Sequence, residues 1–471
     1  MFDYIPAHRV PNLHLYKYSG TDKSLVSKYI LGPYWNWLVQ LFPTTIAPNT
    51  ITLSGLILVC FNFATLAYVD PGLQCATQLK LDPSAHASAL RSAFPADALP
   101  VRPLFGNFGI PAPVAKVDFA PSSHSASCLP AWIFYTWAIC LFAYQSLDSI
   151  DGKQARRTGM AGPLGELFDH GCDALNTTLE CVLCCAALNL GRSVWAPASL
   201  VATLSNFYLT TWEEYHTGTL FLSAFSGPVE GILMIVAIYA LTAAAGGPLF
   251  WDRGILNVFG LAKFLPSDII DKVAHLNLPL NDAFLTFAAL GLLFNIAGSY
   301  SNVIAARRAK KLSVVTPLLG LAPLVLQVGA NVMWIKANRS FILASPAAFL
   351  PFLVYWGISF AYSVGQLIVA HVSKAPFPYL NLATTWSIVA AIDANLPHSY
   401  LQTNPDRTVQ VIYASLAAVT LIYAHFCHNV ITTITTELGM ACFTVKPPTN
   451  LKTPPANGKS SPAATNGKKT N

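Results

Sequence analysis

Long apolar segments recur along almost the whole chain. A helix of about 20 apolar residues is needed to cross the hydrocarbon core of a bilayer. Inside lipid the backbone must satisfy its own hydrogen bonds, which a helix does within one segment. We therefore predict an all-α, polytopic integral membrane protein with about ten transmembrane helices. The ten segments are 46–69, 130–148, 168–190, 194–211, 229–246, 284–305, 314–336, 345–371, 380–395 and 408–430.

The scarcity of charge supports this class. Charged residues make up 11% of the 471 residues and hydrophobic residues 54%, whereas soluble proteins carry about 25% charged residues. So little charge cannot cover a water-facing surface of this size, which argues against a large soluble protein. The basic residues are scattered over loops and form no patch interleaved with aromatic residues, so we expect no nucleic-acid partner.

The basic residues also favour one orientation. Lys153, Arg156 and Arg157 follow the second segment, the cluster 307–311 follows the sixth, and the tail after Lys446 carries further lysines. With ten spans these regions share one side with the N-terminus, and the positive-inside rule makes that side cytoplasmic. Lys336 and Arg339 fall on the other side, in modest conflict with this orientation.

The chain divides into three predicted parts. Residues 1–45 form a cytoplasmic amphipathic segment, residues 46–430 the transmembrane domain, and residues 431–471 a cytoplasmic, largely disordered tail. Residues 70–128 show little periodicity, and we expect a lumenal loop without chemistry of its own. Cys75 and Cys128 flank this loop, and a disulfide between them is a hypothesis.

Four aspartates occur as two pairs, at the end of the second segment and at the start of the third. Asp148 and Asp151 are three residues apart, and Asp169 and Asp173 are four apart, so each pair shares one helix face. A carboxylate within a spanning helix costs about 2.5–3.5 kcal/mol, and four neighbouring ones repel. Divalent cations relieve that repulsion, and oxygen ligands select Mg²⁺, Mn²⁺ or Ca²⁺. Such carboxylates can hold two ions about 3.5–4 Å apart, which stabilise charge on phosphate oxygens.

The residues between the pairs suit a diphosphate. Gly152, Ala155, Gly159, Gly162 and Gly165 are small, which allows close approach of helices and ligand. Arg156 offers a forked pair of donors to phosphate. In an alternative interpretation, Lys153, Arg156 and Arg157 neutralise the aspartates in a salt-bridge network, although acid is then in surplus.

The whole run reads Asp148-x2-Asp151-Gly152-x2-Ala155-Arg156-x8-Gly165-x3-Asp169-x3-Asp173. It resembles the CDP-alcohol phosphotransferase signature at every fixed position. The words DGKQARRT at 151–158, FDHGCDAL at 168–175 and WEEYHTG at 212–218 are similar to the eukaryotic choline/ethanolamine phosphotransferase branch. The resemblance covers most of the chain, and loop 70–128 is longer than is usual in the family.

The resemblance implies an enzyme that joins CDP-choline or CDP-ethanolamine to diacylglycerol and releases CMP. It implies a ten-span fold with its catalytic core at about 46–246, a homodimer, and a site facing the cytoplasm in an endoplasmic reticulum or Golgi membrane. It also implies two Mg²⁺ or Mn²⁺ ions. Their expected ligands are Asp148, Asp151 and Asp169, with Asp173 a ligand or close to one.

Further roles follow from the same resemblance. We expect His170, or failing that Asp173, to take the proton of the attacking hydroxyl; a packed polar histidine is the alternative. The residues expected to bind the CDP-alcohol are Asn49, Gln145, Gly152, Arg156 and Glu166. Aromatic faces and carboxylates hold a quaternary ammonium such as choline well, so the residues expected at a head-group or lipid entrance are Trp212, Glu213, Glu214, Tyr215 and Glu230. Asn49 as a helix cap, and an interfacial belt in place of the entrance, are the alternatives.

Two other functions compete. A related enzyme could use another donor or acceptor, such as inositol, glycerol phosphate or ceramide. A metal transporter could also carry aspartates on broken helices, but it would not need the Gly/Ala/Arg pattern between them. The sequence does not decide between choline and ethanolamine.

Overall fold

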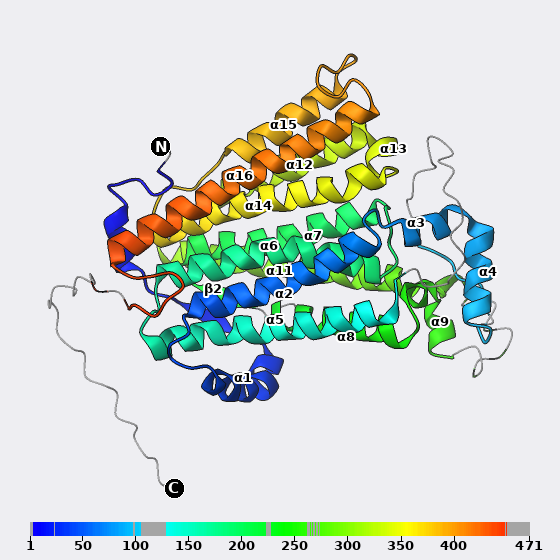
Figure 1. Ribbon diagram of the computed structural model, residues 1–471, viewed down its shortest axis with the longest axis horizontal. Coiled ribbons are helices and arrows are strands. Elements are labelled where there is room, and N and C mark those ends of the chain that lie inside the picture. The colour runs from blue at the N-terminus through cyan, green and yellow to red at the C-terminus, as the bar shows by residue number, and fades with distance from the viewer. Residues whose placement is uncertain are drawn as a thin grey trace, which may run out of the picture.

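The computed structural model describes residues 3–447 and Thr449, apart from Lys23, Ala98, residues 105–128 and 223–227, and most of 261–273. The described chain is a bundle of long helices that run side by side along the long axis of the molecule (Figure 1). In the described part, the only strands form a two-stranded parallel pair, β1 (Gly20–Asp22) with β2 (Leu220–Leu222). The predicted all-α class is confirmed.

Each of the ten predicted apolar segments is helical. The helices are α2 (Pro48–Val69), α5 (Ala131–Thr158), α6 (Pro163–Ala187), α7 (Trp195–Thr217), α8 (Pro228–Ala244), α11 (Leu280–Ala309), α12 (Ala322–Ala337), α14 (Pro346–Ser373), α15 (Leu382–Asn395) and α16 (Pro405–Leu438). The 3-10 turn η7 (Thr316–Leu321) leads into α12.

Five described helical segments are long and apolar enough to cross a membrane by themselves: Pro48–Val69, Leu280–Ala309, Thr316–Ala337, Pro346–Ser373 and Pro405–Leu438. Helices α8 and α15 are shorter than these, while α5 and α6 carry the acidic residues at their adjoining ends. A polytopic membrane protein is therefore confirmed, and the count of ten spans stays a prediction.

The chain ends share one end of the bundle. The amide of Tyr4 donates to Asn429 Oδ1 on α16 at 3.4 Å, and His14 Nε2 lies 2.9 Å from Glu437 Oε1. Because successive helices alternate in direction, the α5–α6 and α11–α12 connections come to this same end, as predicted. Figure 1 shows α3 and α4 at the opposite end.

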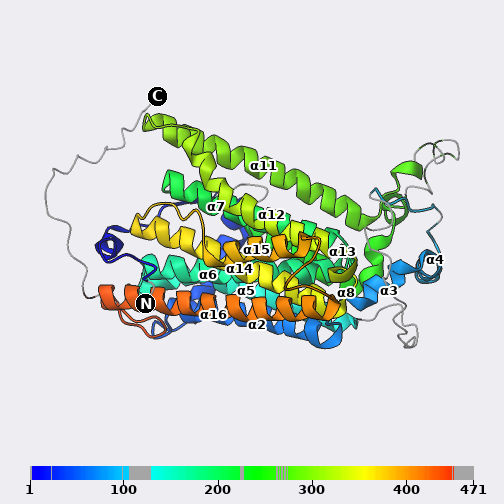
Figure 2. The same cartoon turned by 90° about the horizontal axis from the view of Figure 1, so that it is seen from above.

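Close helix packing forms the core. Helix α2 packs against α5 and α6, and α14 packs against α6, α7 and α16. A Cβ on Gly357 of α14 would clash with the side chain of Thr178 on α6, 2.3 Å from its Oγ1, so only glycine permits this approach. Helix α11 runs along the outside of the bundle (Figure 2) and packs chiefly against α7. Its exposed apolar side chains suit contact with lipid.

The predicted loop 70–128 differs from expectation in its first half. It contains α3 (Gln74–Leu81) and α4 (Pro83–Ala93), because the Asp82 side chain accepts hydrogen bonds from the amides of Ser84 and Ala85 and so caps α4. Lys80 and His86 each lie 2.9 Å from a carboxylate oxygen of Asp252. Cys128 lies outside the described residues, so the disulfide stays a prediction.

The two end segments are also more structured than expected. Helix α16 continues to Leu438, and Thr444 then forms an antiparallel bridge with Ile46. Regular structure therefore extends into the predicted tail, most of which lies outside the described residues. The remaining short elements are η1 (Val10–Leu15), η2 (Ser27–Leu31), α1 (Gly32–Leu38), η3 (Val39–Leu41), η4 (Pro248–Asp252), α9 (Ile255–Val258), η6 (Ala274–Leu276) and α13 (Arg339–Ile342).

Candidate active site

A sharp turn brings the two aspartate pairs together. The C-cap of helix α5 is Gly159, whose φ of +70° is in the left-handed region that glycine adopts readily. Helix α6 begins four residues later at Pro163, in a position where proline's missing amide hydrogen is not needed. The two helices are antiparallel, so the C-terminal part of α5 faces the N-terminal part of α6.

All four predicted carboxylates meet at this turn. The Asp148 carboxylate interacts electrostatically with those of Asp151, Asp169 and Asp173. Potential ligand atoms of Asp169, His170 and Asp173 lie within 4.8 Å of one another. Sequence spacing alone placed each pair on a helix face, and the helix–helix turn places the two faces opposite each other.

The hydrogen bonds of these aspartates leave oxygens available. Thr52 Oγ1 on α2 donates to Asp151 Oδ2, and the Tyr144 hydroxyl donates to Asp173 Oδ1. The Oδ1 atoms of Asp148 and Asp169 are buried and have no hydrogen-bond partner among the described residues. Unpartnered buried carboxylate oxygens are costly, and oxygen donors are what Mg²⁺ and Mn²⁺ prefer. These residues therefore fit a divalent metal site.

The basic residues do not neutralise the aspartates. Lys153 Nζ donates to Asn36 Oδ1 at 2.8 Å, and Arg157 donates to the backbone carbonyls of Val39 and Phe42. Within the described ranges, neither they nor Arg156 lies within ion-pair distance of an aspartate. The salt-bridge interpretation is therefore wrong, and the exposed Arg156 guanidinium stays available for a ligand.

The other predicted CDP-alcohol residues surround the start of α2 and the end of α5. Asn49 is the second residue of α2 and its Nδ2 points to Cys442 Sγ at 3.5 Å; the N-cap is Ala47, so Asn49 is not the cap. Gln145 Nε2 donates to Ser149 Oγ at 2.9 Å, while its Oε1 is buried without a partner among the described residues. A Cβ on Gly152 would be 3.7 Å from Arg156 Nη1.

His170 lies between the aspartates and a second group of ionisable side chains. Its Nδ1 is 3.8 Å from Asp173 Oδ2, and the two side chains keep 17% and 26% of their exposure. It also interacts electrostatically with Glu166 and Glu214. A partly accessible imidazole beside a carboxylate can accept and hold a proton.

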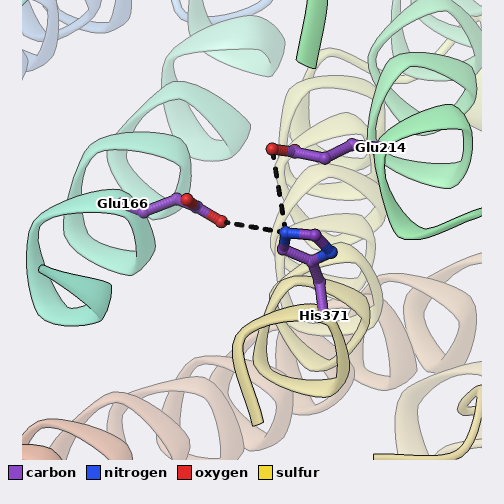
Figure 3. Close-up of side chains that lie close together, drawn as sticks. All are labelled: Glu166, Glu214 and His371. Carbon is purple, nitrogen blue, oxygen red and sulfur yellow. Dashed lines mark ion pairs between the residues drawn. The ribbon is translucent and has the colours of Figure 1, made fainter. Parts of the chain in front are cut away.

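The second group consists of Glu166, Glu214 and His371, which converge from α6, α7 and α14 (Figure 3). His371 Nε2 is 3.8 Å from Glu166 Oε1 and 3.9 Å from Glu214 Oε1. Sequence reasoning missed His371. The available signal was an isolated ionisable residue near the end of an apolar segment, which is a functional-site hypothesis by default.

Four of the five residues predicted for an entrance have other contacts. Trp212 Nε1 donates to Pro317 O at 2.9 Å, and Tyr215 donates to Ala375 O at 3.0 Å. Glu213 accepts from Asn302 on α11, and Glu230 accepts from Ser24. Glu214 is the one that joins the second group.

This arrangement defines a class of protein: a helical membrane protein with a cluster of carboxylates at adjoining helix ends that fits a divalent metal, beside an unengaged guanidinium, a combination suited to phosphoryl transfer. The family model for CDP-alcohol phosphatidyltransferase matches residues 121–264. That range contains α5 to α8 and all four aspartates, whereas His371 lies beyond it.

Known proteins resemble the chain over most of its length. It is 35% identical over 445 residues to an uncharacterized CDP-alcohol phosphatidyltransferase class-I family protein of Schizosaccharomyces pombe, which covers 93% of this chain and 96% of the relative. It is 32% identical to choline/ethanolaminephosphotransferase 1 of Saccharomyces cerevisiae over 80% of this chain and 81% of that protein. It is 28% identical to ethanolaminephosphotransferase 1 of Homo sapiens over 95% of this chain and 96% of that protein. The chain therefore belongs to the CDP-alcohol phosphatidyltransferase family, and the resemblance drawn from its motif is confirmed.

Proposed function

We propose that this enzyme transfers phosphocholine or phosphoethanolamine from CDP-choline or CDP-ethanolamine to diacylglycerol, with release of CMP. The observation that carries the proposal is the pair of facing aspartate clusters with unpartnered buried oxygens, in a chain that is 32% identical to a yeast choline/ethanolaminephosphotransferase. The products are phosphatidylcholine or phosphatidylethanolamine.

Asp148, Asp151, Asp169 and Asp173 would hold two Mg²⁺ or Mn²⁺ ions, which supply neutralisation of the diphosphate charge when bound. The protein's own groups orient this set: Thr52 holds one oxygen of Asp151, and Tyr144 holds one oxygen of Asp173. Arg156 binds a phosphate oxygen through its free guanidinium. Gly152 leaves room for the phosphates beside Arg156, and Asn49 and Gln145 contact the nucleotide.

The reaction forms one bond and breaks one. The diacylglycerol oxygen bonds to the β-phosphorus, the bond from that phosphorus to the bridging oxygen breaks, and CMP leaves with the electron pair. His170 accepts the hydroxyl proton, and Asp173 stabilises the resulting imidazolium from 3.8 Å. Asp173 is the second candidate for the acceptor itself.

The location of the site suits both substrates. The aspartates lie at the end of the bundle that carries the termini and the predicted cytoplasmic basic loops. A water-soluble CDP-alcohol would reach this end from the cytoplasm, and diacylglycerol would enter sideways from the bilayer. We further propose an endoplasmic reticulum or Golgi membrane and a homodimer, as in the branch that the motif resembles.

The direct test uses purified protein in phospholipid nanodiscs containing diacylglycerol, with Mg²⁺ and either CDP-choline or CDP-ethanolamine. We expect equal amounts of CMP and new phospholipid. Product formed only with inositol, glycerol phosphate or ceramide would show that diacylglycerol is not the acceptor. Metal flux in liposomes, without CMP from any CDP-alcohol, would show that the protein is a transporter and not this enzyme.

A further inference from the structure

Glu166, Glu214 and His371 form a cradle at the inner edge of the site. Their potential ligand atoms all lie within 4.8 Å of one another. The side chains of Glu166 and Glu214 are 3% and 5% exposed, and that of His371 is 18% exposed. Figure 3 shows all three side chains pointing toward a common centre.

The cradle contains two buried carboxyl groups. Both carboxylate oxygens of Glu166 are buried without a hydrogen-bond partner among the described residues. Two adjacent buried carboxylates are unfavourable unless a cation or several donors accompany them. A single imidazole at 3.8 and 3.9 Å is too far for a hydrogen bond to either glutamate. A positively charged ligand would therefore stabilise both groups in their ionised form.

The cradle also lies at the right place for one end of the donor substrate. His170 Nδ1 lies 3.8 Å from Asp173 Oδ2, and His170 also interacts electrostatically with Glu166 and Glu214. In both CDP-ethanolamine and CDP-choline, only one oxygen and two carbons separate the β-phosphorus from the charged nitrogen. When the aspartates hold the β-phosphate, the head-group nitrogen therefore lies close to the expected metal ligands and next to the cradle.

The spacing of the donor atoms discriminates between cations. Ligands at about 2.0–2.2 Å from a divalent ion are about 3 Å apart. Acceptors of an ammonium, with N–H···O bonds of about 2.7–2.9 Å in tetrahedral directions, are about 4.5 Å apart. The separations of 3.8 and 3.9 Å from His371 Nε2 to the two glutamates, with none in the cradle above 4.8 Å, lie nearer the ammonium spacing than the metal spacing. They are too narrow to admit a trimethylated nitrogen between the carboxylates.

We propose that Glu166, Glu214 and His371 bind the ammonium of the ethanolamine head group, and that this cradle makes CDP-ethanolamine the preferred donor over CDP-choline. The two carboxylates and the neutral imidazole supply three acceptors for three N–H donors. Choline has no such donors. This inference rests on the proposed transfer from a CDP-alcohol, and it adds a specificity-determining residue from α14, outside the region that the family model matches.

Helix packing explains how α14 reaches the site. Gly357 lets α14 lie directly against Thr178 of α6. The two helices are antiparallel. His371 lies fourteen residues after Gly357 on α14, and Glu166 lies twelve residues before Thr178 on α6, so both residues lie at the same end of the helix pair. The same close contact that packs the core thus delivers the imidazole to the carboxylate.

The test compares donor substrates in one preparation of each variant. The donors are CDP-ethanolamine, CDP-choline and uncharged CDP-propanol, in which a methyl group replaces the ammonium. The variants are the wild type, Glu214→Gln and His371→Phe. Glu180→Gln is the matched control, since Glu180 is another buried glutamate of α6 whose carboxylate accepts a hydrogen bond from Tyr239 instead.

For the wild type we expect kcat/KM to be about tenfold higher with CDP-ethanolamine than with CDP-choline. In Glu214→Gln, kcat/KM for CDP-ethanolamine should fall about 10- to 100-fold, because hydrogen bonds to charged groups are the strong ones. The kcat/KM for CDP-propanol should change less than about twofold, and this retained activity would also show that the variant is folded. In His371→Phe, kcat/KM for CDP-ethanolamine should also fall relative to the other two donors. In Glu180→Gln, the ratios of kcat/KM among the three donors should equal those of the wild type.

Three results would overturn the inference. Equal losses of CDP-ethanolamine and CDP-propanol turnover in Glu214→Gln would mean that the cradle does not sense charge. A wild type that uses CDP-choline at least as well as CDP-ethanolamine would remove the preference. Loss of one bound Mn²⁺ per chain in Glu214→Gln would make the cradle a metal site. Failure of the wild type to release CMP from any donor would instead reject the proposed function.

Discussion

Arg156 and Arg157 are adjacent in sequence but have opposite surroundings. Arg157 Nη1 donates to Phe42 O at 3.1 Å and to Gln154 Oε1 at 2.8 Å, and so ties the segment before α2 to the end of α5. Arg156 is exposed and makes no hydrogen bond or ion pair with any described residue. Consecutive helical residues point about 100° apart, so one guanidinium serves the fold and the other is left for a ligand.

The first prediction separates these two roles. Arg156→Ala should raise the KM for the CDP-alcohol about tenfold or more, because a charge-assisted hydrogen bond to phosphate is lost. Its thermal midpoint in detergent should match the wild type. Arg157→Ala should instead lower the free energy of unfolding by about 1–3 kcal/mol and leave KM unchanged. Interchanged effects would contradict the assignment of Arg156.

The second prediction concerns the metal. Chelation with EDTA should abolish turnover, and Mg²⁺ or Mn²⁺ should restore it. Asp148→Asn and Asp169→Asn should each lower kcat by about 10² or more and reduce Mn²⁺ bound per chain, measured by electron paramagnetic resonance. Asp406→Asn, an exposed aspartate at the start of α16, is the control. Full activity in EDTA would reject a metal-dependent site.

The third prediction concerns the proton acceptor. His170→Ala should lower kcat by about 10²–10⁴, the range for loss of a general base, while Mn²⁺ binding stays at the wild-type level. Asp173→Asn should reduce both kcat and Mn²⁺ binding, because this carboxylate is also an expected metal ligand. Substantial turnover in His170→Ala with intact metal binding would transfer the acceptor role to Asp173.

The fourth prediction concerns the opposite end of the bundle. Burial tends to raise the pKa of Asp252, but the charges and hydrogen bonds of Lys80 and His86 outweigh burial and hold that pKa below its ordinary value. Asp252→Asn should therefore destabilise the protein by about 3–5 kcal/mol, since Lys80 is left buried without its counter-charge. The unfolding free energy reports this loss, and kcat should not change. The double variant Asp252→Asn/Lys80→Met should recover part of it.

The pH dependence of that contribution has a definite sign. A carboxylate with a lowered folded pKa stabilises the fold above its unfolded value, which is 3.8 for Asp252, and loses this effect as pH falls through the folded pKa. The stability difference between wild type and Asp252→Asn should shrink as the pH falls below about 4. A difference that keeps growing below about pH 4 would contradict the ion-pair account.

Local rules predicted most helices and the two aspartate pairs of the candidate site. An apolar segment in lipid has few alternatives to a helix, so all ten segments were found. Loop 70–128 was misjudged because α3 and α4 are short, and their cap at Asp82 and anchor at Asp252 give no periodic signal. The contacts of the predicted entrance residues could not be foreseen, because their partners, such as Pro317 for Trp212, are distant in sequence.

The spacing of the aspartates by itself determined that each helix end carries a carboxylate pair, because helical period follows from the chain alone. The fixed residues around them determined the family. Only the tertiary structure decided which base stays unengaged, which oxygens lack partners, and that His371 meets Glu166 and Glu214 across three helices. Those outcomes depend on contacts between segments about 100 to 200 residues apart, and such contacts are set by packing at positions such as Gly357.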